Sequence, residues 1–434
     1  MPAITVDQQK LVLNAFAATF QNNLIATDAV SWNKYDGEMN DRDRFQVSEQ
    51  VGPRYVVTQT VDGVADLTTG VQDSVFGSEQ FTVNRVFGSS MGWSDFQKIR
   101  DIGEARESVA LKNAATQLAE NIDKYIWDVV SSASNNWVGT TFANGISDYG
   151  DIASGYTRLK EEGVDDADLR AILTYQDRQA ISETVVAYPA TDSLSTTNFR
   201  GGFSGTVNGI PTAFTQQLPL LTTGTRTNGT ISGAAQNVNY KAVAVSGAPG
   251  QYMTQTVAIN GLGIGGTIKK GEVFTVANVF AYDNRAQQSL GRLQQFVAVA
   301  DATADGAGLI AALRIFPAFI VAGSGTGADI AVNTAHATVT AAPAAAAVVT
   351  FIGTAATAYK PRFIMKKDAI CVNTKDLIMP ATGMAKRQNL TKIPVSVRMW
   401  QDSTFTTGEH RVRFDVALTA NIRDRRNIVR INQT

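Results

Sequence analysis

The sequence contains few of the side chains on which most metal sites and covalent catalysts depend. Among 434 residues there are one cysteine, Cys371, and two histidines, His336 and His410. A single cysteine excludes an internal disulfide, so the fold does not need an oxidising compartment. With so few of these residues a Cys/His metal cluster is nearly excluded, and a histidine-activated nucleophile would have to use His336 or His410.

Charge is sparse and balanced. Lys and Arg total 38, Asp and Glu total 39, and the net charge is −1. Proteins that grip nucleic acid through its phosphates are normally strongly basic, so such binding is disfavoured. Charged residues make up only 18% of the chain. This share is below the usual quarter and is typical of uncharged polar interfaces or of strands buried on both faces.

Long apolar runs are also missing. No stretch reaches the length of about 18 apolar residues that a membrane-spanning helix needs. Asp7, Lys10 and Asn14 interrupt the N-terminal segment, which therefore does not read as a secretory signal. These features indicate a soluble cytoplasmic protein, and the length predicts two or three domains.

The longest predicted element is a helix over residues 103–134. No Gly or Pro occurs between Glu104 and Ser134, and Asp101 with Glu104 three residues later is typical of a capped start. Apolar residues recur at helical spacing on one face and polar residues on the opposite face. The apolar face contains Leu111, Ala115, Leu118, Ile122, Tyr125, Val129 and Ala133. The polar face contains Lys112, Asn113, Glu120, Asn121, Lys124 and Asp128.

A shorter amphipathic helix is predicted at residues 7–21, with Asp7 as its cap. Its apolar face consists of Val12, Phe16 and Phe20. This helix either docks on a neighbouring subunit as an arm or packs on its own domain, and the sequence leaves both readings open.

Two strands are predicted between these helices, at residues 54–61 and 80–86, on either side of a polar, turn-rich segment. Such a long hairpin has too little apolar surface to form a core of its own. We therefore expect it to lie on another subunit.

The chain after the long helix alternates helix and strand before its composition changes. We expect helices at 149–162 and 176–187, a buried strand at 169–175, and a strand pair around residues 208–211. From about residue 222 to 357 the chain is rich in Gly, Ala, Thr, Val and Asn, and after Tyr359 mixed charge returns. The predicted strands of this segment are 240–245, 255–259, 272–280, 293–299, 309–315 and 346–352. They indicate a small β-barrel or sandwich inserted into another domain, which closes with strands after residue 410.

Three motifs have a functional and a structural reading. Gly261–Gly266 matches G-x-G-x-x-G, but the helix that a dinucleotide site needs does not follow, so a glycine-rich turn is favoured. Asp165, Asp166 and Asp168 offer acid–base chemistry or a divalent-ion site, but a solvated loop is the better reading.

The third motif is a basic run near the C-terminus, Arg423, Arg425, Arg426 and Arg430, with Asp424 interleaved. Contact with nucleic acid is one interpretation, and ion pairs between subunits or plain solvation is the favoured one. We predict no catalytic residue, cofactor site or metal site, which favours a structural role.

Four segments resemble the major capsid proteins of tailed bacteriophages with the HK97 fold, and most of all the P22-like coat proteins. VNGIPTAFTQQLP (207–219) is similar to the strand–turn–strand that leads into the family's inserted domain. GTIKKGEVFTVANV (266–279) is similar to a strand pair of that domain. KPRFIMKKDAICVNTKDLIMP (360–380) and RFDVALTANIRDRRNIVRI (413–431) resemble the return strand and the last strands.

The resemblance covers nearly the whole chain and implies an α+β, HK97-like fold with an inserted all-β barrel. In this family an N-terminal arm, an extended loop over a neighbouring subunit, a spine helix and an axial domain follow one another. The implied domains are the arm 1–36, the extended loop 37–95, the peripheral spine helix 96–139, the first axial part 140–221, the inserted barrel 222–357 and the axial and peripheral closing strands 358–434.

The function implied by the resemblance is a non-enzymatic major capsid protein. Copies of the chain are expected to form the pentamers and hexamers of an icosahedral head, which encloses double-stranded DNA without sequence-specific binding. The expected partners are other copies, a portal protein and a scaffolding protein, which we expect to be separate because only about 100 residues precede the long helix. The expected location is the virion, after assembly in the host cytoplasm.

Two other hypotheses remain. One is a virion decoration or tail-associated binding module, which has no use for a long hairpin and a long helix. The other is a hydrolase that uses the Asp165–Asp168 cluster. The N-terminal arm with Asp7 and Lys10 is the segment that we expect to meet a partner.

Overall fold

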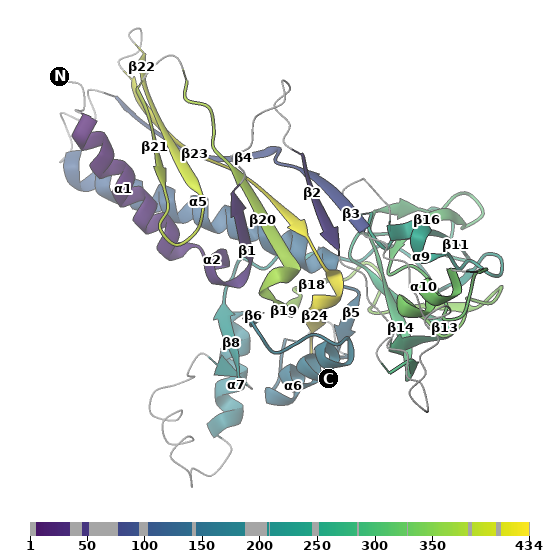
Figure 1. The fold of residues 1–434 in the computed structure, drawn as a ribbon. Coiled ribbons are helices and arrows are strands. Elements are labelled where there is room, and N and C mark those ends of the chain that lie inside the picture. The colour runs from purple at the N-terminus through teal and green to yellow at the C-terminus, as the bar shows by residue number, and fades with distance from the viewer. Residues whose placement is uncertain are drawn as a thin grey trace, which may run out of the picture. The chain divides into compact units, whose positions relative to one another are not determined.

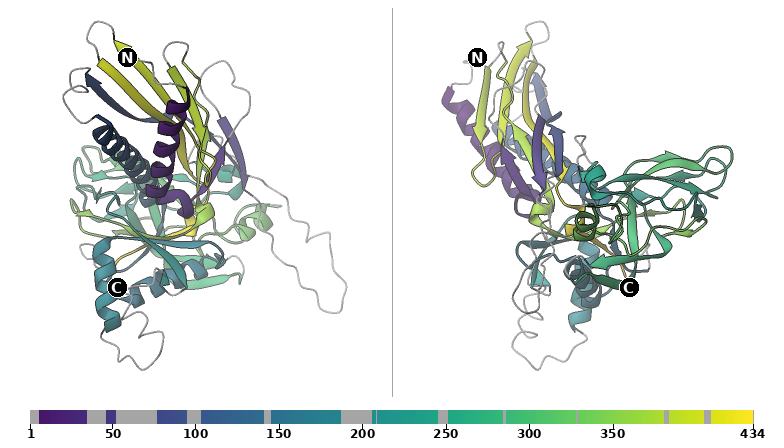
Figure 2. Two further views of the ribbon diagram at one scale, coloured as in Figure 1. Left: turned by 90° about the vertical axis from the view of Figure 1, so that its left-hand side faces the viewer. Right: turned by 45° about the vertical axis from the view of Figure 1, so that its right-hand side comes forward.

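The computed structural model describes residues 6–34, 46–51, 77–94, 103–140, 145–186, 206–207, 209–244, 251–283, 286–327, 329–380, 384–404 and 409–433. The chain divides into two compact units, and each is built from segments far apart in the sequence. Unit 1 consists of Met1–Gln46, Thr82–Val129 and Lys367–Arg423. Unit 2 consists of Val47–Phe81, Val130–Lys366 and Asp424–Thr434. Within unit 1, Figures 1 and 2 show the purple N-terminal helix beside the yellow C-terminal strands.

Unit 1 is built on a six-stranded sheet whose centre is the long strand β23 (Glu409–Ile422). One side of β23 pairs along ten residues with β4 (Arg85–Ser94). Its other side pairs first with β22 and then with β20, and β21 and β1 lie outside these. All pairs are antiparallel except β1 with β20. The bounds are β1 (Ser31–Lys34), β20 (Ile370–Lys375), β21 (Met384–Asn389) and β22 (Ser396–Thr404).

Helices α1 (Val6–Asn23) and α5 (Gly103–Ala133) cover the same face of this sheet. Phe16 of α1 stacks on Phe414 of β23, with ring centroids 3.8 Å apart. Tyr125 of α5 packs against Phe87, 5.4 Å between centroids. Phe87 pairs with Val416 of β23. Val416 is two residues from Phe414, so both point to the same face of the sheet, and Phe87 does too. The short helix α2 (Ala26–Ala29) follows α1.

The prediction of a long helix at 103–134 is confirmed by α5. All six residues of the predicted polar face are exposed, and Ala115, Leu118, Ile122 and Ala133 of the predicted apolar face are buried. The buried face is wider than predicted, because Ile126, Trp127 and Val130 are also fully buried. Asp101, the predicted cap, lies outside the described residues. Among the residues that the structure describes, no helix has the length and hydrophobicity needed to cross a membrane.

The helix predicted at 7–21 is confirmed as α1, and it packs on its own unit. Phe16 and Phe20 are fully buried as expected, but Leu13 and Ala17 complete the buried face and Val12 is only partly covered. Burial of these side chains against β23 stabilises the unit itself. The arm reading therefore applies, within the described residues, only to the exposed side of the helix.

The hairpin prediction is partly wrong. The strand expected at 80–86 is two strands, β3 (Gly77–Thr82) and β4, separated at Val83 and Asn84. Strand β3 pairs with β2 (Gln46–Val51), which was not predicted. A side-chain hydroxyl explains the break, since the Asn84 N–H donates to Oγ1 of Thr419 instead of to a strand carbonyl. The strand expected at 54–61 lies outside the described residues.

Unit 2 contains a second six-stranded sheet in the order β5-β24-β19-β6-β8-β7. Its strands are β5 (Asn136–Val138), β24 (Ile428–Ile431), β19 (Arg362–Lys366), β6 (Leu169–Leu173), β8 (Ile210–Phe214) and β7 (Thr206–Val207). The predicted strand at 169–175 and the strand pair around 208–211 are confirmed by β6, β7 and β8. Chain segments from residues 136 to 431 thus share one sheet.

Two helices, α6 (Tyr149–Glu161) and α7 (Tyr175–Val186), supply apolar residues to the core of this sheet and confirm the predicted helices. Ile152 and Leu159 of α6 and Ile181 of α7 are fully buried with Ile364 and Val429 of the strands. Gly155 allows the close approach of α6, because a Cβ there would lie 2.5 Å from Cγ2 of Ile431. A larger residue at 155 would separate helix and sheet.

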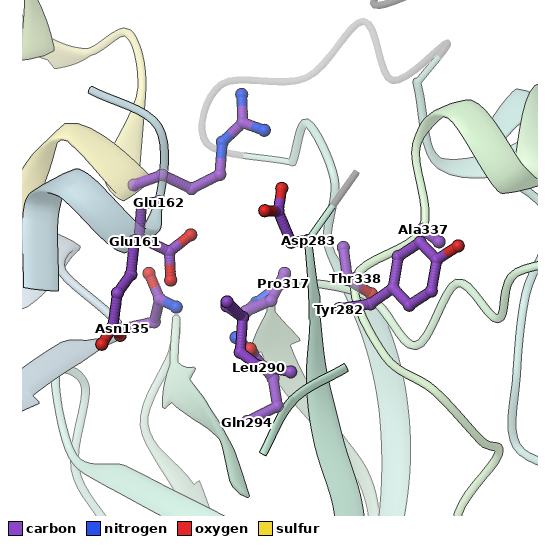
Figure 3. A pocket seen from close by; sticks show the side chains of 12 residues that line it. Asn135, Glu161, Glu162, Tyr282, Asp283, Leu290, Gln294, Pro317, Ala337 and Thr338 are labelled. Carbon is purple, nitrogen blue, oxygen red and sulfur yellow. The ribbon is translucent and has the colours of Figure 1, made fainter. Parts of the chain in front are cut away.

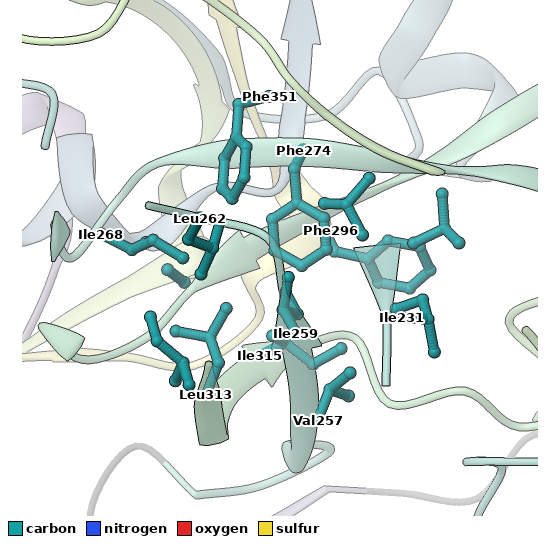
Figure 4. Packing of buried hydrophobic residues seen from close by; sticks show 14 of the residues in the cluster. Ile231, Val257, Ile259, Leu262, Ile268, Phe274, Phe296, Leu313, Ile315 and Phe351 are labelled. Carbon is teal, nitrogen blue, oxygen red and sulfur yellow. The ribbon is translucent and has the colours of Figure 1, made fainter. Parts of the chain in front are cut away.

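The second part of unit 2 is a closed, entirely antiparallel barrel in the order β10-β11-β16-β14-β13-β17. Its strands are β10 (Gly229–Ile231), β11 (Gln255–Asn260), β16 (Ile310–Phe316), β14 (Gln288–Ala298), β13 (Val273–Asp283) and β17 (Val348–Phe351). Figure 4 shows its apolar interior, where Phe274 packs against Phe296 and Phe351. The predicted all-β insertion is therefore a barrel.

One predicted strand of the insertion is wrong and one is missing. Residues 240–245 were expected as a strand, but Tyr240–Ala244 forms helix α9, because Tyr240, Val243 and Ala244 recur at helical spacing and are buried together. Strand β10, only three residues long, was not predicted, yet its pairing with β17 closes the barrel. Helix α10 (Asp329–Ala335) was also not predicted.

The remaining elements are short connections. The barrel is joined to the rest of unit 2 through an antiparallel pair, in which Leu221 and Thr222 lie opposite Tyr359 and Ala358. The short elements are β9 (Leu221–Thr222), β18 (Ala358–Tyr359), β12 (Thr267–Ile268), β15 (Ala302–Thr303), η1 (Lys367–Ala369) and η2 (Arg425–Asn427). The closing strands expected after residue 410 are confirmed as β23 and β24.

Candidate functional site

The three aspartates that suggested acid–base chemistry lie on an exposed loop of unit 2, and two of them have lysine partners. Asp165 is 2.9 Å from Nζ of Lys366. Asp166 forms an ion pair with Lys160 and accepts a hydrogen bond from the Tyr156 hydroxyl at 2.6 Å. The hydrogen bonds from Lys366 and Lys160 lower the pKa of Asp165 and Asp166 below the usual range. Carboxylates that stay ionised in this way cannot supply a proton at neutral pH.

The third aspartate, Asp168, has a φ of +58° and lines a hollow of about 350 Å³ with Asp166 and Ile210. The hollow also contains Tyr156, Leu169, Arg170, Gly209 and Pro211. Within the described residues no group of three His, Cys, Asp or Glu side chains is arranged to hold a metal ion. The loop reading of this cluster therefore fits the geometry better than a hydrolase site.

The two histidines and the cysteine, the other candidates for catalysis, lie within helices and strands or pack against them. His336 is buried and its ring stacks on Tyr240, 3.6 Å between centroids. Cys371 is buried in β20. His410 belongs to β23, where its backbone lies opposite Ser403 and Trp93, but its side chain lies outside the described part. A G-x-S-x-G pattern does occur at 88–92, but it runs straight through β4 and lacks the strand-to-helix turn of a nucleophile elbow.

The G-x-G-x-x-G match at 261–266 is a turn, as predicted. It connects β11 to β12, and Gly261, Gly263 and Gly265 all have positive φ values. Within this segment the backbone N–H of Leu262 donates to the carbonyl of Gly308 at 3.1 Å, and the N–H of Gly266 donates to the carbonyl of Gly263 at 3.0 Å. Because no helix N-terminus follows, the loop cannot hold a pyrophosphate in the dinucleotide manner.

The prediction for the basic run is wrong for Arg425 and Arg430. Both were expected at the surface, but Arg430 is fully buried and Arg425 is 6% exposed. Arg425 donates to the carbonyl of Ala133 at 3.3 Å, and Arg430 donates to the carbonyl of Ser134 at 2.5 Å. These carbonyls end α5 and have no partner within the helix, so two guanidinium groups terminate it.

Arg430 also connects the helix end to the inserted barrel. It donates to the carbonyl of Gly271 at 2.7 Å and lies 4.9 Å from the ring centre of Trp137. Burial lowers the pKa of Arg430 below its ordinary value. Gly271 approaches closely, since a Cβ there would lie 3.1 Å from the Cα of Ser132. One side chain thus holds strand β24, the end of α5 and a barrel turn together.

Arg426 behaves differently from its neighbours. It forms a double hydrogen bond with Asp424, at 3.0 Å to Oδ1 and 2.9 Å to Oδ2. Asp424 also caps η2 by accepting a hydrogen bond from the backbone N–H of Arg426. Ion pairs between subunits or plain solvation was the favoured interpretation of this run, whereas the ion pair of Arg426 with Asp424 forms within the chain.

A second connection between the barrel and the sheet is made by Gln295 of β14. Its side-chain oxygen accepts a hydrogen bond from the backbone N–H of Trp137 at 2.7 Å, and its side-chain NH2 group donates to the backbone carbonyl of Trp137 at 3.0 Å. The side chain thus replaces a neighbouring strand at the open edge of β5. Arg158 of α6 donates to the same Gln295 oxygen at 3.0 Å.

An arginine bridge lies beside Gln295. Arg292 of β14 donates to Glu161 and Glu162 at the end of α6, each at 2.8 Å. Burial, followed by the charge of Arg292, lowers the pKa of Arg158 to about 10. Charged hydrogen bonds at partly buried positions are stronger than neutral ones, so this contact fixes β14 against α6.

A small polar cavity lies at the same junction. Figure 3 shows Glu161, Glu162, Asp283 and Asn135 around it. Its volume is about 40 Å³, which fits one water molecule but not a substrate, since ligand sites measure about 300–1,000 Å³. Among the described residues, the junction of β14 with α6 therefore serves as a structural contact and not as a ligand site.

A buried ion pair at the start of the inserted barrel could not be predicted from the sequence. Arg226 pairs with Glu272, and both side chains are almost completely buried. Glu272 also accepts hydrogen bonds from the N–H groups of Gly224 and Lys269 at 2.6 and 2.7 Å. The Arg226 guanidinium lies 3.9 Å from the ring centre of Phe351. The two buried charges thus compensate each other next to the entry of the chain into the barrel.

Unit 1 contains one buried titratable group with a displaced pKa. Asp123 of α5 accepts hydrogen bonds from the N–H groups of Ile25 and Ala26, at 2.9 and 3.0 Å, and so caps α2. Burial outweighs these two bonds and raises its pKa from 3.8 to about 7. The ionised form is therefore costly in the folded subunit and inexpensive in the unfolded chain.

We expect the Asp123→Asn variant to lose part of the pH dependence of subunit stability. Because the folded-state pKa is raised, the stabilisation by Asp123 is complete below about pH 4 and is lost as the pH rises through about 7. Between pH 5 and 6 the wild-type free energy of unfolding should therefore fall by about 1.4 kcal/mol relative to that of the variant. Urea titrations of both proteins across this range test this, and parallel pH profiles would contradict it.

The comparisons with known proteins give one family and several structures. A family model described as "P22 coat protein - gene protein 5" matches residues 1–427. No curated protein matches the chain.

Three solved capsid structures are similar at low sequence identity. The mature capsid of bacteriophage PhiM1 is 8% identical, with a TM-score of 0.43 over 94% of this chain and 87% of that chain. The capsid of Ralstonia phage GP4 is 8% identical, with a TM-score of 0.43 over 94% and 86%. The capsid of cyanophage P-SCSP1u is 7% identical, with a TM-score of 0.41 over 95% and 88%. Similarity this low supports no conclusion about what the chain does.

Proposed function

The chain belongs to the P22 coat protein family, and on this basis we propose how it builds a phage head. Membership makes it a major capsid protein that self-assembles into an icosahedral shell and resides in the virion. Our proposal is that pentamers and hexamers of the chain enclose double-stranded DNA, that a separate scaffolding protein directs assembly in the host cytoplasm, and that a portal protein occupies one vertex. The observation that carries it is the family match along nearly the whole chain.

We assign the segments to roles in the shell as follows. We assign the barrel, with its two-strand connection, as an inserted domain, and the second six-stranded sheet as part of the axial domain. We assign α5 as the spine helix and the exposed side of α1 as the arm. The proposed domains are the arm 1–36, the extended loop 37–95, the spine helix 96–139, the axial parts 140–221 and 358–434, the latter with peripheral closing strands, and the inserted barrel 222–357.

The proposed protein is not an enzyme. Asp165 and Asp166 are paired with lysines, and His336 is stacked against Tyr240. Arg425 and Arg430 of the basic run are used inside the fold, which supports the view that packaged DNA is enclosed without sequence-specific contacts. The alternative of a decoration or tail module is not retained, because the family match includes unit 1 as well as the barrel.

Electron microscopy of the expressed chain, alone and together with the product of the adjacent gene, tests this proposal. We expect closed icosahedral shells when both proteins are present and irregular or absent shells when the chain is alone. Regular shells from the chain alone would refute the separate scaffolding protein. Only monomers under both conditions, with a folded circular-dichroism spectrum, would refute the assembly proposal.

A paired variant tests the role of the arm. Lys10 and Leu11 are exposed on α1, and Leu11 is 74% exposed, whereas Phe16 is buried. Changing Lys10→Glu and Leu11→Glu together should leave the subunit folded but prevent shell formation with the scaffolding partner. Deleting the helix would not discriminate, because it removes Phe16 and Phe20 from the core. Val109→Glu together with Lys112→Glu, both exposed on α5, makes the same change in net charge and is the control. Normal shells from the arm variant would refute this role.

A further inference from the structure

Asn260 and Gly261 form an exposed Asn-Gly pair with an unusual hydrogen bond. Asn260 is the last residue of β11, and Gly261 begins the following turn with a φ of +79°. The backbone N–H of Gly261 donates to Oδ1 of Asn260 at 2.7 Å. Because this backbone group is a donor, the side-chain atom that it contacts must be the oxygen. The amide of Asn260 is thus folded back over the peptide that follows it.

We propose that Asn260 is a site of spontaneous deamidation. The backbone nitrogen of Gly261 attacks Cγ of Asn260 and loses its proton to solvent. The Cγ–Nδ2 bond then breaks, and Nδ2 takes up one proton from solvent and leaves as ammonia. The product is a five-membered succinimide ring. Water then adds to one of the two ring carbonyls and breaks its bond to the ring nitrogen. The result is aspartate, or isoaspartate when the backbone carbonyl is attacked.

The local geometry favours ring closure. The hydrogen bond holds the attacking nitrogen beside the carbonyl group and polarises that carbonyl. Gly261 has no side chain to hinder the approach, and around the position of a Cβ the nearest atom is the Cα of Gly229 at 3.8 Å. Glycine also tolerates the main-chain rotation that the ring requires.

The chain contains a second described Asn-Gly pair with the opposite geometry. Oδ1 of Asn228 accepts a hydrogen bond from the N–H of Phe351 at 3.3 Å, so it is turned toward β17. Gly229 is buried in β10 opposite Val349, and a Cβ there would lie 2.6 Å from the carbonyl oxygen of Asn260. The nitrogen of Gly229 cannot reach its neighbour's Cγ unless β10 leaves the barrel. Asn228 is therefore an internal control with the same local sequence.

The modification would alter the end of a barrel strand. Asn260 lies opposite Thr230 where β11 meets β10. Aspartate adds one negative charge to each copy, and isoaspartate also lengthens the main chain by one methylene group at this pair. Every copy in a shell carries the same site, so an ageing particle accumulates charge at equivalent positions.

Peptide mapping by mass spectrometry tests the proposal on the intact, purified chain. Trypsin places the two sites in separate peptides, residues 227–241 and 242–269. After incubation at mildly alkaline pH, we expect Asn260 to convert about tenfold faster than Asn228, the ratio that a barrier lower by about 1.4 kcal/mol produces. In urea-unfolded protein the two sites should convert at similar rates.

Two outcomes would overturn the proposal. One is equal conversion of Asn260 and Asn228 in the folded chain, and the other is conversion of Asn260 only after unfolding. In the Asn260→Gln variant, peptide 242–269 should show no early conversion, because the larger ring that glutamine requires closes slowly. Unchanged conversion of this peptide in the variant would place the modification elsewhere.

Discussion

Replacing Arg430 by alanine is expected to lower the free energy of unfolding of the subunit by about 3–5 kcal/mol. The side chain is fully buried, and it supplies the hydrogen bonds to the carbonyls of Ser134 and Gly271. Alanine leaves both carbonyls without this donor, removes the contact with Trp137 and creates a cavity. Urea unfolding followed by circular dichroism measures the change, together with the assembly competence of the variant.

Arg423→Ala is the matched control, because Arg423 belongs to the same basic run but is exposed. Its free energy of unfolding should lie within about 0.5 kcal/mol of that of the wild type. Arg430→Lys should be intermediate, since a single ammonium group is too compact to reach both carbonyls in the manner of a guanidinium. Equal stability of the two alanine variants would mean that Arg430 does not anchor the barrel and the end of α5.

Replacing Asp177 by alanine should cost about 3–5 kcal/mol, a similarly large effect in another part of unit 2. Asp177 is almost fully buried and holds Arg362 of β19 at 2.9 Å. Its carboxylate also accepts hydrogen bonds from the N–H groups of Ile146 and Thr174. Thr174 in turn accepts from the Asp177 N–H, so the pair forms a capping box at the start of α7. Alanine would leave Arg362 buried without its counter-charge.

Asp165→Ala provides the control for this experiment, because Asp165 also pairs with a basic residue of β19, Lys366, but at the surface. An exposed ion pair contributes little, so this variant should unfold at the wild-type urea concentration. Asp177→Asn should recover part of the loss, since its amide oxygen can still accept from Thr174 N–H. The explanation fails if Asp177→Ala and Asp165→Ala have the same stability.

Those features that depend on contiguous residues could be predicted from the sequence. No Gly or Pro interrupts α5 after Gly103, its first residue, and the helix and its exposed polar face follow from the apolar repeat alone. The change of composition near residues 222 and 357 likewise indicated an all-β insertion, because a shift to Gly, Thr and Val is a local property. The turn at Gly261–Gly266 followed from the absence of a helix after it.

Features that depend on partners distant in the sequence could not be predicted. Strand β10 is three residues long and has no periodicity to detect, yet it closes the barrel by pairing with residues more than a hundred positions away. Tyr240–Ala244 contains good strand formers but becomes a helix, because its apolar residues face the core together. Tertiary packing outweighs intrinsic propensity in such short segments.

The basic run at the C-terminus shows the same division most clearly. The sequence by itself determined that four arginines follow one another with one aspartate among them, and surface charge is the usual fate of such a run. Only the tertiary structure decided that Arg425 and Arg430 are buried, since it brings the carbonyls of Ala133 and Ser134, about 300 positions earlier, within hydrogen-bonding distance. A buried guanidinium needs several acceptors at once, and these come from segments that no local pattern connects.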